Sequence, residues 1–509
     1  MTKKNTSSKF RLLLTWEVGK KSKTREVSKM NSKLRKTKKQ VVTTDFAENV
    51  LSQEEIRKKI QVIEQELKSS TWRDLETNGK FAKNDKISFI SDEMLIAGCD
   101  IGSETHYIRA IDSRGRELSK GAFEFSNSAE GFASAKTWML DLAAKNDKNQ
   151  IVVGLEPTGH YWFALTAWMI SEGISVVQVN PYAVKQSKEI EDNSQLKDDR
   201  KDPKLIANLV KDGNYGMPYL PEEIYADMRR LSMFRDQLTE DRIRNINRLH
   251  REMKIYYPEY ADAFGKLEGS FALEILCVAP MPSDIIALGV DGLRNIWHEA
   301  KLRGRGYSRA NDIVNYAKTS VGLKEGTDAG REAIKWFVKQ IQSLDEQLSE
   351  IEETLHAKCR EIPHAENILE INGVGENTLS GILAEMGDIS RFDDVKEIQK
   401  LSGLNLVACS SGKHKGQTKI SHRGRKRLRY WLFQAAKSAV AHAPEFKQLH
   451  VYYTTRENNP LKKMQSLIVI ACKILRVIYT ILKTGRRYDP EKLLKDIRYP
   501  ERNTEQAVA

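Results

Sequence analysis

The chain has 509 residues, of which 30% are charged and 40% hydrophobic, with a formal net charge of +13. This length allows about two to four domains with their own cores, and the composition excludes a wholly disordered chain. No apolar run approaches the roughly 18 residues that cross a bilayer, and the 5 cysteines form no CxxC pair, which argues against a zinc site or a disulfide framework. We therefore expect a cytoplasmic protein with no membrane partner, whose excess of basic residues favours a polyanionic partner.

The first 93 residues are predicted to be a basic, partly disordered extension. Residues 1–40 are rich in Lys and Arg and nearly free of Asp and Glu, as in arms that bind nucleic acid or in solvated leaders. Ser52 and Glu55 have the spacing of a capping box, and apolar residues repeat through 52–67. We expect one short helix there.

An α/β domain is predicted at 94–220. The apolar run Leu95–Gly102 carries Asp100 in its middle and predicts a buried strand. Further strands are expected at 107–111, 117–125, 151–155 and 175–179, and helices at 129–145, 160–171 and 202–211. A three-strand meander followed by alternating helix and strand matches the mixed sheet of an RNase H-like (RuvC-like) fold.

Long helices are predicted within 221–360. Apolar residues recur at helical spacing over 222–257 and as a heptad pattern over 334–355, which indicates either an antiparallel hairpin or a dimerising coiled coil. An ordinary helical bundle fits the same pattern. Residues 259–330 have mixed character and are interpreted as an insertion.

The last domain, 361–490, is expected to be mainly helical, with a loose tail at 491–509. Near its start, Gly373 and Gly375 lie between helical stretches, as in a helix-hairpin-helix, where backbone N–H groups approach a phosphate. A tight turn explains the same two glycines. An apolar helix is predicted at 465–483.

Four carboxylates are candidates for one metal site. Asp100 lies within a predicted strand, Glu156 follows another, and Asp199 and Asp202 are three residues apart at a helix start. Taken singly, each could be a cap or a surface residue, and Asp198 competes with Asp199 for the role. Together they would repel one another unless cations lay among them, and hard oxygen ligands select Mg²⁺ or Mn²⁺.

Several short sequence blocks occur together in this chain. The blocks are Cys99–Gly102, Leu155–Gly159, Lys197–Asp202, Ile206–Ala207, Ile371–Gly375, Gly403–Leu404, Ser410–Gly412 and Ile420–Gly424. Together they resemble the DEDD transposases of the insertion sequence 110 family, over about 94–258 and 360–445 and in the family's order.

The resemblance implies a recombinase with a RuvC-like domain, a coiled coil and a C-terminal transposase domain that supplies a serine nucleophile. Ser411 fits that role best and Ser410 is the alternative; without the family, the pair would be interpreted as a turn. The resemblance also implies a bridge RNA that pairs with donor and target DNA, and Mg²⁺ bound by the four carboxylates. The serine would form a phosphoserine link to DNA, which preserves bond energy for rejoining.

A basic run after the serine is predicted to hold a phosphate backbone, and a solvated helix face is the less favoured alternative. Its candidate nucleic-acid-binding residues, beside the two glycines, are Lys413, Lys415, Lys419, Arg423, Arg425 and Arg427.

The chain also departs from the family pattern. Pro203 replaces a small residue, Leu406 a common proline and His422 a common lysine, and the extension before Met94 is longer than the pattern needs. None of these changes removes a candidate catalytic group.

We expect an oligomeric DNA recombinase of a mobile element, a dimer or tetramer assembled through its long helices. Two alternatives remain: a hydrolytic RuvC-like nuclease such as a junction resolvase, which needs the carboxylates but not the serine, and a non-catalytic nucleic-acid-binding protein.

Overall fold

The computed structural model describes residues 52–69, 83–191, 201–264, 266–302, 306–407, 410–411, 414–415, 418–495 and 497. The basic leader predicted at 1–40 lies outside these residues. The capping box at Ser52 is confirmed: the Glu55 carboxylate accepts a hydrogen bond from the Ser52 backbone N–H at 2.8 Å, at the start of α2 (Gln53–Ser69).

A mixed sheet of six strands forms the centre of the first folded region, and α4 (Lys83–Phe89) precedes it. Its spatial order is β3-β2-β1-β4-β5-β6; β4 and β5 run parallel to β1, and the other neighbouring pairs are antiparallel. The strands are β1 (Met94–Ile101), β2 (Thr105–Ile111), β3 (Phe123–Ser126), β4 (Gln150–Leu155), β5 (Ser175–Val179) and β6 (Tyr215–Gly216).

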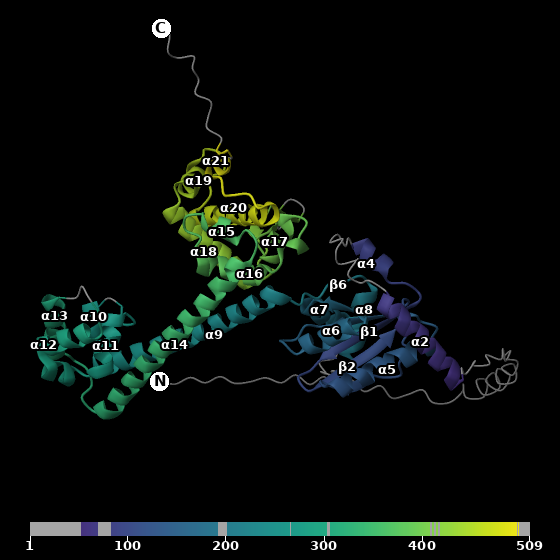
Figure 1. Cartoon of the computed structure of the whole chain (residues 1–509), viewed down its shortest axis with the longest axis horizontal. Coiled ribbons are helices and arrows are strands. Elements are labelled where there is room, and N and C mark those ends of the chain that lie inside the picture. Colours follow the sequence, from purple (N-terminus) through teal and green to yellow (C-terminus); the bar gives the residue numbers. More distant parts are fainter. Residues whose placement is uncertain are drawn as a thin grey trace, which may run out of the picture. The chain divides into compact units, whose positions relative to one another are not determined.

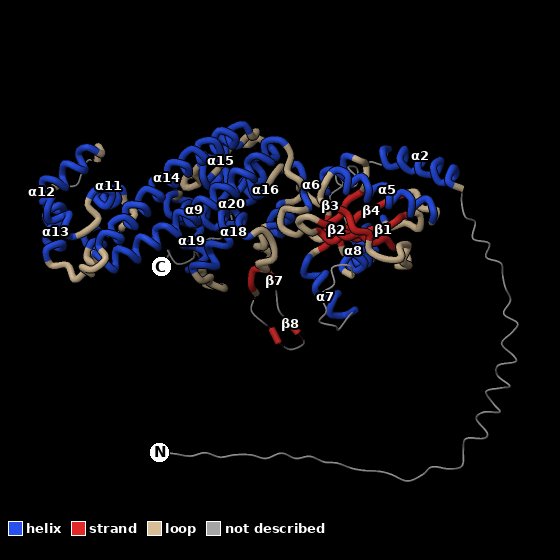
Figure 2. The backbone as a smooth tube through the Cα atoms, turned by 90° about the horizontal axis from the view of Figure 1, so that it is seen from below, coloured by secondary structure: helices blue, strands red, loops and turns tan. Residues whose placement is uncertain are grey.

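Helices cover both faces of this sheet, and Figure 2 shows the strands between α5 and α8. The helices are α5 (Ala129–Lys145), α6 (Trp162–Ser171), α7 (Pro181–Glu191) and α8 (Asp202–Lys211). The predicted bounds of α5 and α8 are confirmed. The long strand predicted at 117–125 is wrong: Glu117 makes a single bridge to Ile111, and regular pairing begins only at Phe123. Ser119 and Gly121 interrupt that segment, and such residues favour turns over a strand.

The two long helices are α9 (Glu223–Tyr256) and α14 (Thr327–Glu361), and they run side by side (Figure 1). Ion pairs join Arg235 of α9 to Glu352 of α14, and Arg242 of α9 to Asp345 of α14. A later residue of α9 thus pairs with an earlier residue of α14. The helices are therefore antiparallel, which agrees with the hairpin alternative within one chain.

Residues 259–330 fold into helices with a core of their own. That core includes Tyr257, Tyr260 and Trp297, packed against Leu249 of α9 and Ile334 of α14. The helices are α10 (Tyr260–Phe264), α11 (Ser270–Val278), α12 (Pro282–Glu299) and α13 (Tyr307–Lys318).

The C-terminal region is mainly helical, and its core also takes in Met228 of α9 and Leu355 of α14. Its helices are α15 (Ala365–Leu369), α16 (Glu376–Met386), α17 (Val395–Leu401), α18 (Lys426–His442), α19 (Pro444–Thr455), α20 (Lys463–Thr484) and α21 (Pro490–Leu494). The sequence analysis expected no apolar run long enough to span a bilayer. By length and composition alone, however, α20 is long and apolar enough to do so. Half of its apolar window is buried, and Ile470, Ile474 and Ile478 pack in this core. That burial is typical of a core helix in a globular domain.

Candidate active site

Asp100 and Glu156 are brought together by the register of two parallel strands. The last paired residues of β1 and β4 are Cys99 and Leu155, so Asp100 and Glu156 are the next residues along each chain. Gly98 lies directly opposite Gly154 two residues earlier. Because side chains alternate in a strand, each carboxylate lies on the face of its glycine. The two acids therefore occupy the same rim and the same face of the sheet.

Helix α8 brings Asp202 to this face because the two glycines leave room for it. A Cβ added at Gly98 would lie 1.9 Å from the carbonyl oxygen of Pro203, and one at Gly154 would lie 2.3 Å from the Val210 side chain. Only a residue without a side chain permits such an approach. Asp202 is the first residue of α8 and is buried, with Pro203 following in the first turn.

The charges at this rim are interdependent. The Lys188 ammonium group of α7 hydrogen-bonds the Asp202 carboxylate, whose side chain is 13% exposed. Burial and then the negative charge of Asp100 raise the pKa of the Glu156 carboxyl, Lys188 opposes them, and Asp202 raises it further. The carboxylates of Asp100 on β1 and Asp202 on α8 therefore both act electrostatically on Glu156 at the end of β4.

The donor chemistry of this rim suits a hard divalent cation, because carboxylate oxygens are the ligands that Mg²⁺ and Mn²⁺ prefer. Asp199 and its competitor Asp198 lie outside the described residues. Among the residues that the structure describes, no three His, Cys, Asp or Glu side chains are already grouped at metal-binding spacing. Instead, Lys188 supplies a positive charge at Asp202.

The predicted nucleophile lies in a β-hairpin rather than an isolated turn. β7 (Leu406–Val407) pairs antiparallel with β10 (Lys419–Ile420), and between them β8 (Ser410–Ser411) pairs antiparallel with β9 (His414–Lys415). In backbone register, Ser411 is opposite His414 and Ser410 is opposite Lys415. Ser411 is thus the last paired residue before the connection between the two strands.

Two family models match this chain. One described as "Transposase" matches residues 97–258, and one described as "Transposase IS116/IS110/IS902 family" matches residues 365–451. The first range contains the sheet with its three described carboxylates, and the second contains the hairpin with Ser411. The chain belongs to the IS110 family of transposases.

Two curated relatives match this IS110-family transposase over most of its length, and a third matches a part of it. The 44.8 kDa protein of insertion element IS116 from Streptomyces clavuligerus is 23% identical, with 77% of this chain and 96% of the relative aligned. The 42 kDa protein of insertion element IS900 from Mycobacterium paratuberculosis is 21% identical, with 77% of this chain and 97% of the relative aligned. The pilin gene-inverting protein of Moraxella bovis is 28% identical over 33% of this chain and 51% of its own length. The transposase is accordingly a DNA recombinase.

The basic run of this transposase divides into exposed and internal residues. Lys419 and Arg423 are exposed. Arg425 donates a hydrogen bond to the Glu385 carbonyl oxygen, and burial lowers its pKa to about 10. Arg427 forms an ion pair with Asp236 of α9 at 2.7 Å. These two arginines therefore anchor the start of α18. Of the exposed pair, Arg423 places its guanidinium 5.5 Å from the centroid of the Tyr182 ring. Lys413 lies outside the described residues, and only the backbone of Lys415 is described.

The two glycines of the transposase's predicted helix-hairpin-helix differ in surroundings. Gly373 has φ +92°, and a Cβ there would lie 2.7 Å from the Ala439 backbone N of α18, so this glycine serves close packing. Gly375 caps α16, and its Cβ position is open within 4 Å. Glu376, in the first turn of α16, pairs with Arg360 of α14 and with His356. Of the two glycines, Gly375 is the one whose surroundings leave room for a ligand.

Sequence reasoning missed Lys188 at the carboxylate rim. It lies fourteen residues before Asp202, and no motif marks it. It also missed Glu117, which pairs with Arg109 of β2 and Lys204 of α8, each at 2.5 Å. Only the packing of α8 on the sheet brings these charges together.

Proposed function

We propose that this transposase cuts and rejoins DNA strands of a mobile element through a phosphoserine at Ser411, assisted by Mg²⁺ held by Asp100, Glu156, Asp199 and Asp202. The observation that carries the proposal is the convergence of Asp100, Glu156 and Asp202 on one rim of the sheet. Acids that share one rim and raise the pKa of Glu156 gain little for the fold and suit a cation-dependent phosphate reaction.

An RNase H-like fold is part of this proposal. The strand order β3-β2-β1-β4-β5, with two antiparallel strands beside a parallel set, supports it. In such a sheet the acids lie on neighbouring strands near the rim, where ligands reach α/β sheets. The positions of Asp100 and Glu156 agree with that arrangement.

Each residue has a distinct task in the proposed reaction. When bound, Mg²⁺ would supply Lewis-acid polarisation of the scissile phosphate. Asp100 and Glu156 would hold the cation from adjacent strands, and Asp202 would do so from the first turn of α8. Lys188 would exchange its hold on Asp202 for the phosphate or for solvent, because cation binding removes the need for its charge.

The covalent step balances without an added reactant. The Ser411 Oγ forms a bond to phosphorus as the bond from phosphorus to one deoxyribose oxygen breaks. The serine proton ends on that released hydroxyl, so the number of phosphate ester bonds is unchanged. Rejoining is the reverse reaction with a hydroxyl from another strand end. A serine hydroxyl requires such activation, since it is a weak nucleophile when neutral.

A guide RNA and a second protein copy complete the proposal. The net charge of +13 and the exposed Lys419 and Arg423 support polyanionic partners. A dimer or tetramer assembled through α9 and α14 would let Ser411 of one copy serve the carboxylates of another. A cytoplasmic location is consistent with DNA and RNA as partners.

The test is a covalent adduct on a denaturing gel. Purified protein with its co-expressed RNA is incubated with the element's junction DNA and Mg²⁺. We expect an adduct that is lost in Ser411→Ala and Asp100→Ala and retained in Ser410→Ala, the matched control one residue away. Cleavage without an adduct, unaffected by either serine change, would leave a hydrolytic nuclease. No Mg²⁺-dependent cleavage at all would leave a nucleic-acid-binding protein.

A further inference from the structure

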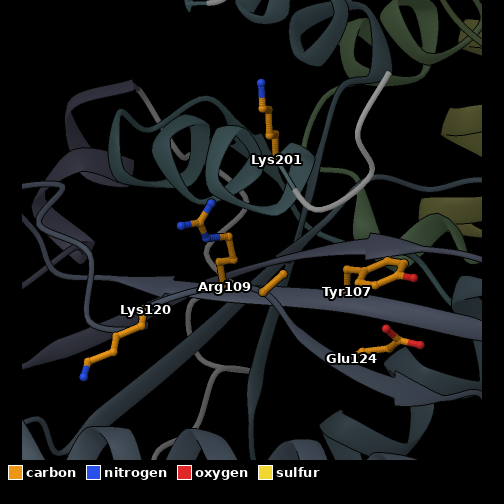
Figure 3. Close-up of a pocket in the computed structure, with 7 residues that line it drawn as sticks. Tyr107, Arg109, Lys120, Glu124 and Lys201 are labelled. Atoms are coloured by element: carbon orange, nitrogen blue, oxygen red, sulfur yellow. The ribbon is translucent and has the colours of Figure 1, made fainter. Parts of the chain in front are cut away.

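Glu117 joins the first turn of α8 to the sheet. Its carboxylate accepts one hydrogen bond from the Arg109 guanidinium of β2 and another from the Lys204 ammonium group of α8, each at 2.5 Å. The hydrogen bond from Lys204 is the main cause that lowers the pKa of the Glu117 carboxyl, so this group is ionised at neutral pH. Figure 3 shows the Arg109 side chain extending toward the helix that begins after Lys201. We call these contacts the Arg109–Glu117–Lys204 bridge.

The bridge lies where α8 rests on the sheet. Arg109 is directly opposite Gly98 in the register of β2 and β1, so both residues occupy one face. On that face the Gly98 position meets the Pro203 carbonyl oxygen, and Lys204 is the next residue of α8. Asp202, the proposed metal ligand, directly precedes Pro203. The bridge therefore holds the same helical turn that carries Asp202.

The segment that carries Glu117 is itself fixed to β2. The Leu118 N–H donates to the Ala110 carbonyl oxygen at 2.9 Å, and Glu117 makes a backbone bridge to Ile111. The Asp112 carboxylate closes the preceding turn by accepting two backbone N–H hydrogen bonds, at 3.0 Å and 2.7 Å. These contacts give the Glu117 carboxylate a fixed position from which to hold α8.

The bridge also differs from the Lys188–Asp202 ion pair in how a bound cation would affect it. In the proposed function a cation takes the Asp202 carboxylate, and Lys188 then releases it. The Glu117–Lys204 pair contains no rim carboxylate, so it can persist while Lys188 leaves. Repulsion between Asp202 and Glu156 favours movement of this turn away from the rim, and the persisting pair opposes that movement.

We propose that Glu117 is a positioning residue: through Lys204 it holds the first turn of α8, so that Asp202 stays at the rim and binds a divalent cation together with Asp100 and Glu156. The inference rests on the proposed function, which assigns a cation to these acids. Glu117 acts through α8, because Arg109 and Lys204 already occupy its carboxylate oxygens.

Mn²⁺ binding to the full-length protein tests this role. Mn²⁺ suits the same oxygen ligands as Mg²⁺, and the free ion is counted by electron paramagnetic resonance. Nucleic acid is left out because it binds Mn²⁺ itself, and the binding that Asp100→Ala removes is assigned to the rim. Lys204→Met breaks the bridge and Lys204→Arg keeps it. The control is Lys136→Met, which removes the same charge from α5 on the other face of the sheet, where Lys136 pairs with Glu172 at 2.9 Å.

Charge alone and positioning predict opposite results for Lys204→Met. Removing a positive charge near the rim would by itself tighten cation binding. Loss of positioning weakens it, and we expect an affinity about tenfold lower, the smaller end of the losses seen when a group that orients a metal ligand is removed. Lys204→Arg and Lys136→Met should bind Mn²⁺ as the wild type does. Thermal unfolding without added cation checks that each variant is folded.

Mn²⁺ affinity in Lys204→Met that equals or exceeds the wild-type value would overturn the inference and leave the proposed metal site intact. Wild-type protein without Asp100-dependent Mn²⁺ binding would refute that metal site instead. The bridge is then judged by hydrogen exchange of the α8 amides, which Lys204→Met should accelerate relative to Lys136→Met. Equal exchange rates in the two variants would overturn the inference in that case.

Discussion

The Lys188 ammonium group is bound to the Asp202 carboxylate at the rim where Asp100 and Glu156 also lie. The Lys188 side chain is 40% exposed and that of Asp202 is 13% exposed, so the lysine can withdraw into solvent while the aspartate stays in place. The Lys188 ammonium group therefore neutralises part of the negative charge at this rim, and a bound cation could take its place.

Replacing Lys188 with Gln should make the fold depend on divalent cations. Without the ammonium group, Asp202 is left among like charges, and we expect a loss of about 1–2 kcal/mol in the free energy of unfolding in EDTA. Mg²⁺ should restore it, and should bind more tightly than to wild type. Thermal unfolding with and without Mg²⁺ measures both effects. Equal Mg²⁺-induced shifts in variant and wild type would contradict this prediction.

Replacing Glu156 with Gln should stabilise the protein at neutral pH and abolish DNA cleavage. The folded-state pKa of Glu156 is raised above its ordinary value, so the folded state binds this proton more tightly than the unfolded state. The contribution to stability is present below the ordinary pKa and is lost as pH rises through the folded pKa. Unfolding midpoints at pH 4 and pH 7.5 should converge at the lower pH; a variant less stable at pH 7.5 would refute the argument.

Replacing Gly98 with Ala should displace α8 and lower stability by about 3 kcal/mol. The added Cβ would lie 1.9 Å from the Pro203 carbonyl oxygen. Because that oxygen belongs to the backbone of α8, the clash can be relieved only by moving the helix. Gly216→Ala in β6 is the matched control, since nothing lies within 4 Å of its Cβ position. Thermal unfolding compares the two. Similar midpoints would mean that α8 does not rest on Gly98 as described.

His106 should make the domain sensitive to acid. Its side chain is fully buried against Phe125 and Phe132, and burial lowers its pKa below the ordinary value. The unfolded state then binds this proton more readily, so stability is full above the unfolded pKa of about 6.5 and is lost as pH falls below it. His106→Phe, which keeps a ring, should lose less stability between pH 7.5 and pH 5.5. Equal losses would exclude His106 as the source.

Local pattern was enough to predict most elements of the sheet domain. Helices such as α5 and α8 have continuous periodicity and distinct ends, so their bounds agree with the sequence prediction. The segment before β3 was predicted as strand because its alternation is strand-like. Alternation does not report whether a neighbouring strand is available, and only a single bridge forms there.

The candidate site could be predicted only in part. The acids are visible in the sequence because they follow strands or begin a helix. Lys188 and the Glu117 pairs depend on how α7 and α8 pack, and a long-range contact leaves no local pattern. Likewise, Arg425 and Arg427 belong to a basic run in the sequence, but the structure uses both for internal contacts with Glu385 and Asp236.

The absence of side chains at Gly98 and Gly154 also has a genetic consequence. Every missense change in a glycine codon adds a Cβ, and at these two positions it would meet α8 within 2.3 Å. No amino-acid substitution at either position is therefore conservative. Among diverging copies of a mobile element, those that carry any other amino acid at either position should be copies that no longer move.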